Sequence, residues 1–275
     1  MKQSTIAFIG CGNMSRSLIG GLIKDGTPRE RLRGADPAAA QRDRIRQQLG
    51  IEVLSDNSAA ATGADVVVLA VKPQSMHDAV ASLSEVLRRD APLVLSIAAG
   101  IRMDTIRGWL GADIPLVRAM PNTPALIGAG ASALCAGGLA GPPQRELAEG
   151  ILRAVGTVVW LEDERLMDVV TALSGSGPAY WFLMMEALEA EAVNLGLPQE
   201  QARLLTIETA LGAARMALES VSDPAELRRQ VTSPGGTTER ALQVLQQGGF
   251  AELLARALAA ARDRSSELAD TLKGR

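Results

Sequence analysis

The chain has 275 residues, more than one hydrophobic core usually holds, so we expect two domains. Hydrophobic residues make up 47% of it and charged residues 21%, a composition that excludes a disordered chain. The net charge of −3 gives no electrostatic reason to bind nucleic acid or an anionic membrane.

Targeting and metal signals are also missing from the sequence. Uninterrupted apolar runs such as Val66–Val71 are too short to cross a bilayer, and the first residues do not form a leader segment, so we expect a cytoplasmic protein. Cys11 and Cys135 are too few for a disulfide framework. With His77 as the only histidine, we expect free thiols and no metal site.

The first part of the chain alternates short β-rich runs with helical stretches, which predicts an α/β domain over residues 1–162. Its parallel sheet should be covered on both faces. The expected strands are Thr5–Ile9, Leu32–Ala35, Glu52–Leu54, Val66–Ala70, Leu93–Ile97, Leu116–Ala119, Ser132–Leu134 and Val158–Trp160.

A glycine motif follows the first expected strand. Gly10, Cys11, Gly12, Asn13, Met14 and Ser15 join that strand to a helix, with Ser15 where a dinucleotide-binding signature usually has glycine or alanine. Asp36 ends the second strand at the spacing of a residue that accepts a hydrogen bond from a ribose 2′-hydroxyl. The context therefore predicts cofactor binding rather than a purely structural turn.

The charges near Asp36 leave the cofactor open. The carboxylate would repel a 2′-phosphate, which favours NADH. Arg42 and Arg44 start the next helix and either reach such a phosphate or face solvent.

Two further segments end strands at the same sheet edge, where open α/β sheets hold their ligands. Ala70, Val71, Lys72 and Pro73 end the fourth strand. Ala98, Ala99 and Gly100 follow the fifth, and their small side chains either leave room for a nicotinamide or only allow tight packing.

Residues 163–275 are rich in Ala, Leu, Glu and Arg at helical spacing, which predicts a second, all-helical domain. The segments Ser174–Pro178 and Gly196–Pro198 should separate helices. Asp223 followed by Pro224 has the pattern of a helix start.

The segment Ser233–Thr238 places two glycines and three hydroxyls at the start of a predicted helix. Free N–H groups there suit a small carboxylate. An ordinary loop with a helix cap explains these six residues equally well when they are taken alone.

Together these segments, with Met120–Pro124, resemble the pyrroline-5-carboxylate reductase family over nearly the whole chain. The resemblance implies reduction of the cyclic imine 1-pyrroline-5-carboxylate to L-proline with NADPH or NADH, the last step of proline biosynthesis. It also implies a Rossmann-like domain followed by an all-α dimerisation domain, with homodimers often assembling into a homodecamer.

The resemblance also assigns roles. Substrate carboxylate would be bound by Ser233, Gly235, Gly236 and Thr237, and Thr238 would hydrogen-bond the ring nitrogen as the catalytic group. Ser176 would help to shape the substrate pocket. Cofactor contacts map onto these residues: Gly10, Cys11, Gly12, Asn13, Met14, Ser15, Asn57, Ala70, Val71, Lys72, Pro73, Ala98, Ala99 and Gly100. Asp36 departs from the small hydroxyl residue of many relatives.

Three alternatives remain open at this point. Lys72 is a rival catalytic acid, although an exposed lysine is the commoner outcome. A β-hydroxyacid dehydrogenase would need a lysine on the helix after Ser174, and the sequence up to Glu200 has none. A sensor that binds NAD(P) without turnover would not need the Ser233–Thr238 segment.

Overall fold

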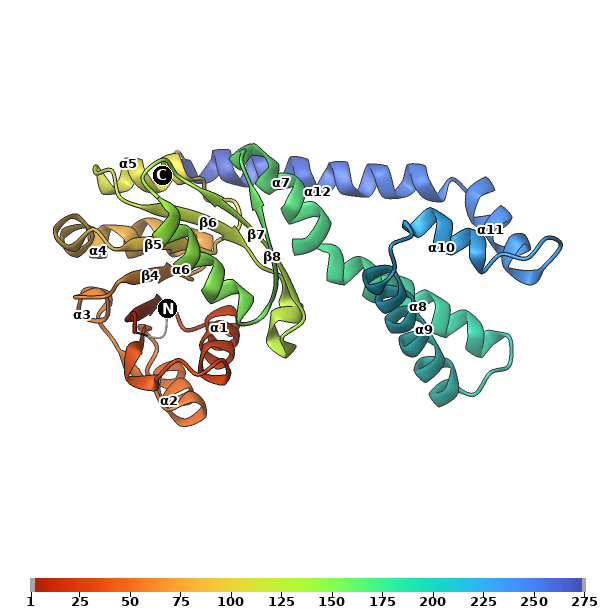
Figure 1. Ribbon diagram of the computed structural model, residues 1–275, viewed down its shortest axis with the longest axis horizontal. Coiled ribbons are helices and arrows are strands. Elements are labelled where there is room, and N and C mark those ends of the chain that lie inside the picture. Colours follow the sequence, from red (N-terminus) through yellow and green to blue (C-terminus); the bar gives the residue numbers. More distant parts are fainter. Residues whose placement is uncertain (1–2, 274–275) are drawn as a thin grey trace. The chain divides into compact units, whose positions relative to one another are not determined.

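The computed structural model describes residues 3–273, which divide into two compact units (Figure 1). The first unit contains the chain up to Ser176 together with the segment from Ala260 onward, and the second contains Gly177–Ala259. The expected boundary lay between residues 162 and 163. The observed division differs because the segment before Ser176 and the end of the last helix both pack with the sheet, where Met167 and Leu272 join its core.

An eight-stranded sheet forms the centre of the first unit, in the order β3-β2-β1-β4-β5-β6-β7-β8 (Figure 1). All eight expected strands are present, with ends shifted by a few residues. They are β1 (Ile6–Ile9), β2 (Leu32–Ala35), β3 (Glu52–Leu54), β4 (Val66–Leu69), β5 (Leu93–Ser96), β6 (Leu116–Met120), β7 (Gly130–Ala136) and β8 (Gly156–Leu161).

The expectation of a parallel sheet is correct for β1 to β6 and wrong for the last two strands. β7 pairs antiparallel with β6, and β8 runs parallel to β7. Only residues 121–129 connect β6 to β7, which is too short for the crossover that parallel neighbours need. A full helix, α6, lies between β7 and β8 and allows those two strands to run parallel.

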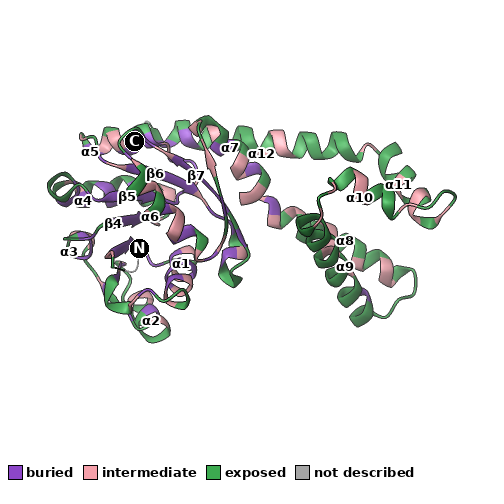
Figure 2. Cartoon of the chain, viewed as in Figure 1, coloured by how far each residue is buried: buried purple, intermediate pink, exposed green. Residues whose placement is uncertain are grey.

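Both faces of the sheet are covered, because successive side chains of a strand point to opposite faces. In β1, Ala7 and Ile9 join one core cluster, whereas Ile6 and Phe8 join the other. Helices α3, α4, α5 and α7 supply the first cluster, and α1, α2 and α6 supply the second. Figure 2 shows the strands as the most continuously buried part of this unit.

The helices of this unit are α1 (Asn13–Lys24), α2 (Ala39–Leu49), α3 (Asn57–Ala61), α4 (Met76–Asp90), α5 (Met103–Leu110), α6 (Pro142–Arg153) and α7 (Met167–Val170). Shorter turns are η1 (Arg29–Arg31), η2 (Pro73–Ser75), η3 (Thr123–Ile127), η4 (Glu164–Leu166) and the π-helical turn η5 (Thr171–Gly175).

The last helix, α12 (Phe250–Lys273), is held on the first unit by its C-terminal half. The buried Ser265 hydroxyl donates to Asp168 Oδ1 at 2.7 Å. Arg102 pairs with Asp270 at 3.2 Å and donates to Ser266 Oγ at the same distance. These polar contacts and the burial of Leu272 explain why the chain returns to the first unit after Ala260.

The second unit is helical, as expected. It contains α8 (Gly177–Asn194), α9 (Gln199–Glu219), α10 (Pro224–Gln230), α11 (Thr237–Gln247) and the start of α12. The predicted start of α10 is confirmed, because Asp223 accepts a hydrogen bond from the backbone N–H of Glu226 at 2.8 Å. Within residues 3–273, no helix combines the length and apolar character that crossing a membrane requires.

The Ser265 to Asp168 bond makes a stability prediction. Ser265→Ala should lower the free energy of unfolding by about 1–3 kcal/mol, because the largely buried Asp168 carboxylate loses the hydroxyl that donates to it. Thermal unfolding of the purified protein measures this loss. Thr271→Ala on the same helix removes an exposed hydroxyl that bonds only to its own helix, so it should change stability by less than about 0.5 kcal/mol. Equal stability of the two variants would contradict the assigned role of Ser265.

Candidate functional site

The glycine motif closes a sharp turn between β1 and α1. Gly10 has a φ of +90°, which glycine adopts without strain. A Cβ at Gly10 would lie 2.9 Å from Val71 Cγ1 and 3.0 Å from the Ala70 carbonyl atoms, so any larger residue would collide with the end of β4. Nothing lies within 4 Å of a Cβ built on the exposed Gly12, and no side chain caps α1. The turn therefore leaves helix N–H groups open to a ligand.

Ser15 completes the turn although it departs from the usual glycine. Its buried hydroxyl donates to the Gly10 carbonyl at 2.5 Å, which ties the first turn of α1 to the end of β1. The side chain faces the protein rather than a ligand. Hence the departure at this position is compatible with the motif.

Cys11 also points inward. Its thiol contacts the Ala35 carbonyl at 3.6 Å and occupies the space that a Cβ on Gly34 would need. Its backbone N–H donates to Asp36 Oδ2 at 3.0 Å. Cys11 thus links the glycine turn to the end of β2, and exposed ligand contacts in this turn fall to Gly12 and Asn13.

The other predicted cofactor residues of the first unit end neighbouring strands. Ala70 continues the β1–β4 pairing by donating from its N–H to the Ile9 carbonyl at 2.9 Å. Lys72 is exposed, which agrees with the alternative that it is a surface lysine and not a catalytic acid. Ala98 and Gly100 are buried, and Gly100 approaches Leu268 of α12, so tight packing accounts for part of that segment. Asn57 opens α3 and donates from Nδ2 to Ser82 Oγ at 3.0 Å.

These segments meet at one sheet edge. Strand order changes direction between β1 and β4, the position at which doubly wound sheets bind dinucleotides. An open glycine turn, an uncapped helix start and Asp36 at the end of β2 fit such a molecule. His77 is exposed on α4, and its ring packs in a T-shaped arrangement with that of Trp109.

The Asn122 side chain joins two of the segments that resemble the family, Met120–Pro124 and Ser174–Pro178. Asn122 is buried, donates from Nδ2 to the Ser174 carbonyl at 3.0 Å, and accepts from the Ala131 N–H at 2.9 Å. Ser174 belongs to the π-helical turn η5, whose end is marked by a bond from the Ser176 N–H to the Thr171 carbonyl. The predicted Ser176 is half-buried beyond this turn.

The predicted substrate segment forms the loop before α11. Gly235 has a φ of +73°, and Gly236 is the N-cap of the helix that begins at Thr237. Ser233 and Thr237 are exposed, whereas Thr238 is half-buried. The expectation that a helix starts here is confirmed.

Two backbone groups of this loop have partners within the loop, which differs from the expectation. The Gly235 N–H donates to Glu239 Oε2 at 2.8 Å, and the Gly236 N–H donates to the Ser233 carbonyl at 3.0 Å. Among the described residues, the Thr237 and Thr238 N–H groups have no such partner. Sequence reasoning missed Glu239, although a glutamate three residues after a helix cap is a known capping pattern.

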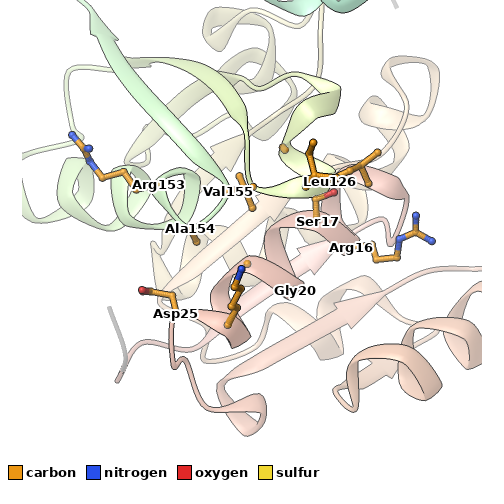
Figure 3. Close-up of a pocket in the computed structure, with 13 residues that line it drawn as sticks. Arg16, Ser17, Gly20, Asp25, Leu126, Arg153, Ala154 and Val155 are labelled. Atoms are coloured by element: carbon orange, nitrogen blue, oxygen red, sulfur yellow. The ribbon is translucent and has the colours of Figure 1, made fainter. Parts of the chain in front are cut away.

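A cavity of about 690 Å³ lies elsewhere in the first unit (Figure 3). It is bounded by α1, η3 and the end of α6, and Arg16 and Arg153 lie on opposite sides of it. None of the predicted site residues lines it. Part of its wall is set by close packing, because a Cβ on Gly21 would lie 2.6 Å from the Ala154 carbonyl oxygen.

The inward thiols give a chemical prediction. Burial, reinforced by the Asp36 carboxylate, raises the pKa of Cys11 to about 12, and burial raises the pKa of Cys135 as well. A raised pKa keeps each thiol protonated and unreactive at pH 8. A thiol-reactive chromophore should therefore label neither cysteine in the native protein and both after denaturation. Cys11→Ser should leave one reactive group after denaturation, and rapid native labelling would contradict the described burial.

Comparison with known proteins places these features in a family. The model for pyrroline-5-carboxylate reductase dimerisation matches residues 164–268, and the model for NADP oxidoreductase, coenzyme F420-dependent, matches residues 5–100. Pyrroline-5-carboxylate reductase of Pseudomonas aeruginosa is 51% identical over 99% of both chains. The protein of the same name from Vibrio alginolyticus is 42% identical over 98% of both chains.

Solved structures agree. A pyrroline-5-carboxylate reductase from Coxiella burnetii has a TM-score of 0.92 at 46% identity, with 96% of this chain and 98% of that chain covered. A Plasmodium falciparum pyrroline carboxylate reductase, solved with NADP bound, has a TM-score of 0.87 at 27% identity, with coverage of 98% and 99%. The glycine turn, the loop before α11 and the end-to-end similarity agree, and the chain belongs to the pyrroline-5-carboxylate reductase family.

Proposed function

We propose that this chain reduces 1-pyrroline-5-carboxylate to L-proline with NADPH or NADH, the last step of proline biosynthesis. The observation that carries the proposal is the 51% identity to a reductase of this name over nearly the whole of both chains. The expected cytoplasmic location stays a prediction.

In this proposal the first unit binds the cofactor. Gly12, Asn13 and Met14 present the open N–H groups of the α1 start, while Gly10, Cys11 and Ser15 shape the turn. The rest of the proposed cofactor site, along the same edge of the sheet, is formed by Asn57, Ala70–Pro73 and Ala98–Gly100. The reduced nicotinamide, when bound, supplies the two electrons and the hydrogen of the reduction.

The second unit binds the substrate carboxylate in this proposal. Ser233 offers a hydroxyl, and Thr237 offers a free N–H at the positive end of the α11 dipole. Gly235 and Gly236 have internal partners, so they contribute mainly by shaping the loop, with Glu239 holding Gly235.

Thr238 is the proposed group at the ring nitrogen. Its hydroxyl forms no hydrogen bond to another residue in the part of the chain that the structure describes, so it remains available to a ligand. A cyclic imine is basic enough to take a proton from water, so the site needs no strong acid. Positioning of two reactants alone accounts for about 7–11 kcal/mol of barrier lowering in favourable cases.

The loop variants test this assignment. Thr238→Ala should lower kcat while leaving the affinity for NADPH and NADH unchanged, and Thr238→Ser should restore most of the rate because it keeps the hydroxyl. Ser233→Ala should mainly raise the substrate KM, by about tenfold or more, since a hydrogen bond to a charged group contributes roughly 1.5–3 kcal/mol. Steady-state oxidation of NADPH or NADH dependent on added 1-pyrroline-5-carboxylate measures both effects.

Two results would contradict the proposal. Cofactor binding without substrate-dependent oxidation would favour the sensor alternative. Equal losses of cofactor affinity and turnover in Thr238→Ala would remove Thr238 from its assigned role.

We further propose that the second unit forms a homodimer. Figure 2 shows its helices as largely exposed, and large apolar side chains are among the exposed residues. Phe182 and Leu183 of α8 are each 65% exposed, and Leu204 of α9 is 60% exposed. So much apolar surface is typical of an interface that a second chain covers. Residues 164–268 match the family's dimerisation model. We propose in addition that these homodimers assemble into a homodecamer.

Charged substitutions test the dimer. Leu183→Glu and Leu204→Glu should weaken self-association by more than tenfold, because each substitution places a charge where about 1.5–3 kcal/mol of apolar burial is expected per side chain. Sedimentation equilibrium measures the effect and also gives the assembly mass. Leu139→Glu is the matched control, since Leu139 is 54% exposed but lies outside the segment that matches the dimerisation model. A wild-type monomer at micromolar concentration would contradict the proposal.

A further inference from the structure

Asp36 is fixed at the end of β2 by the backbone on both sides of it. Its Oδ2 accepts from the Cys11 N–H at 3.0 Å, and its Oδ1 accepts from the Ala38 N–H at 3.0 Å. The Asp36 N–H itself donates to the Leu54 carbonyl at 3.0 Å, which continues the β2–β3 pairing. The carboxylate is therefore held directly beside the glycine turn, and each oxygen keeps a lone pair for a further donor.

The nearby Arg42 guanidinium is bonded to backbone carbonyls and not to the Asp36 carboxylate. Arg42 Nη1 donates to the Asp36 carbonyl at 3.0 Å and to the Pro37 carbonyl at 2.8 Å. These bonds hold the guanidinium against the backbone of residues 36–37, which follow β2. Among the described residues, no ion pair joins Arg42 to the Asp36 carboxylate. Arg44 is exposed on α2. The Asp36 carboxylate thus carries its negative charge within hydrogen-bond distance of the glycine turn, at the Cys11 N–H.

We propose that the fixed carboxylate of Asp36 selects cofactors whose adenosine ribose carries a free 2′-hydroxyl, so that this chain prefers NADH to NADPH. The inference rests on the proposed function and adds the cofactor specificity that it leaves open. A 2′-hydroxyl donates to the carboxylate, whereas a 2′-phosphate brings a second negative charge against it. The Plasmodium falciparum relative was solved with NADP bound, so the proposed preference rests on Asp36 of this chain and not on the family.

The test measures binding separately from turnover. Calorimetric titration of the full-length protein with NAD⁺ and with NADP⁺ gives two dissociation constants without substrate. The wild type should bind NAD⁺ at least about tenfold more tightly, as a charged hydrogen bond implies. Asp36→Asn keeps one acceptor oxygen for the Cys11 N–H, gives up the acceptor for the Ala38 N–H and removes the charge, so it should reduce this ratio by about tenfold.

Two further variants control the result. Asp43→Asn removes the same charge from an exposed position on α2, where the carboxylate pairs with Arg46, and should leave the ratio unchanged. Arg42→Ala should weaken the binding of NAD⁺ and of NADP⁺ by the same factor, because the role of Arg42 here is to hold the backbone of residues 36–37. Tighter wild-type binding of NADP⁺, lost selectively in Arg42→Ala, would overturn the proposal and assign the phosphate to Arg42.

Salt dependence gives a readout that needs no variant. Raising the salt from about 0.01 M to about 1 M shortens the Debye length from about 30 Å to about 3 Å, so screening should narrow the preference for NAD⁺. A preference that widens with salt would overturn the proposal even if Asp36→Asn did not fold.

The substrate assay separates this inference from the proposed function. Faster substrate-dependent oxidation of NADPH than of NADH, measured as kcat/KM, would overturn the cofactor preference and leave the reductase assignment intact. Tighter NAD⁺ binding without any turnover would support the cofactor preference and overturn the reductase assignment.

Discussion

The turn between β1 and α1 is the constraint on which the rest of the first unit depends. β4 lies so close to Gly10 that a Cβ there would sit 2.9 Å from Val71, and the positive φ of Gly10 adds a second reason for glycine. Through Cys11 and Ser15 the same turn is bonded to the ends of β2 and β1. A ligand that binds the helix start therefore meets a rigid surface, which reduces the ordering cost of binding.

The second unit follows a different physical logic. The sheet of the first unit buries apolar side chains on both faces, whereas α8 and α9 leave large apolar side chains exposed within one chain. Helices of this kind gain most of their stability from packing rather than from intrinsic propensity. The loop before α11, the proposed substrate-binding segment, belongs to this unit, so its stability should depend on the proposed association of two chains.

Several elements were predictable because their causes are local. Alternating apolar runs located all eight strands, and Asp223 with Pro224 marked the start of α10. The position of Asp36 followed from the spacing of the glycine motif. The predicted direction of β7 is wrong, because the apolar pattern of a strand does not state how its neighbour runs, and the short connection after β6 makes the pair antiparallel. The partners of Gly235 and Gly236 were also missed, since an internal hydrogen bond depends on where Glu239 comes to lie.

The sequence alone determined the succession of strands and helices, the glycine turn, the loop before α11 and the family resemblance, because each is written in residues that are neighbours along the chain. Only the tertiary structure decided that Asn122 bridges Ser174 and Ala131, that Ser265 of the last helix bonds to Asp168, and that Arg42 is bonded to backbone carbonyls. Those outcomes depend on the distance and direction between groups brought together by folding, and hydrogen bonds form only when both are satisfied.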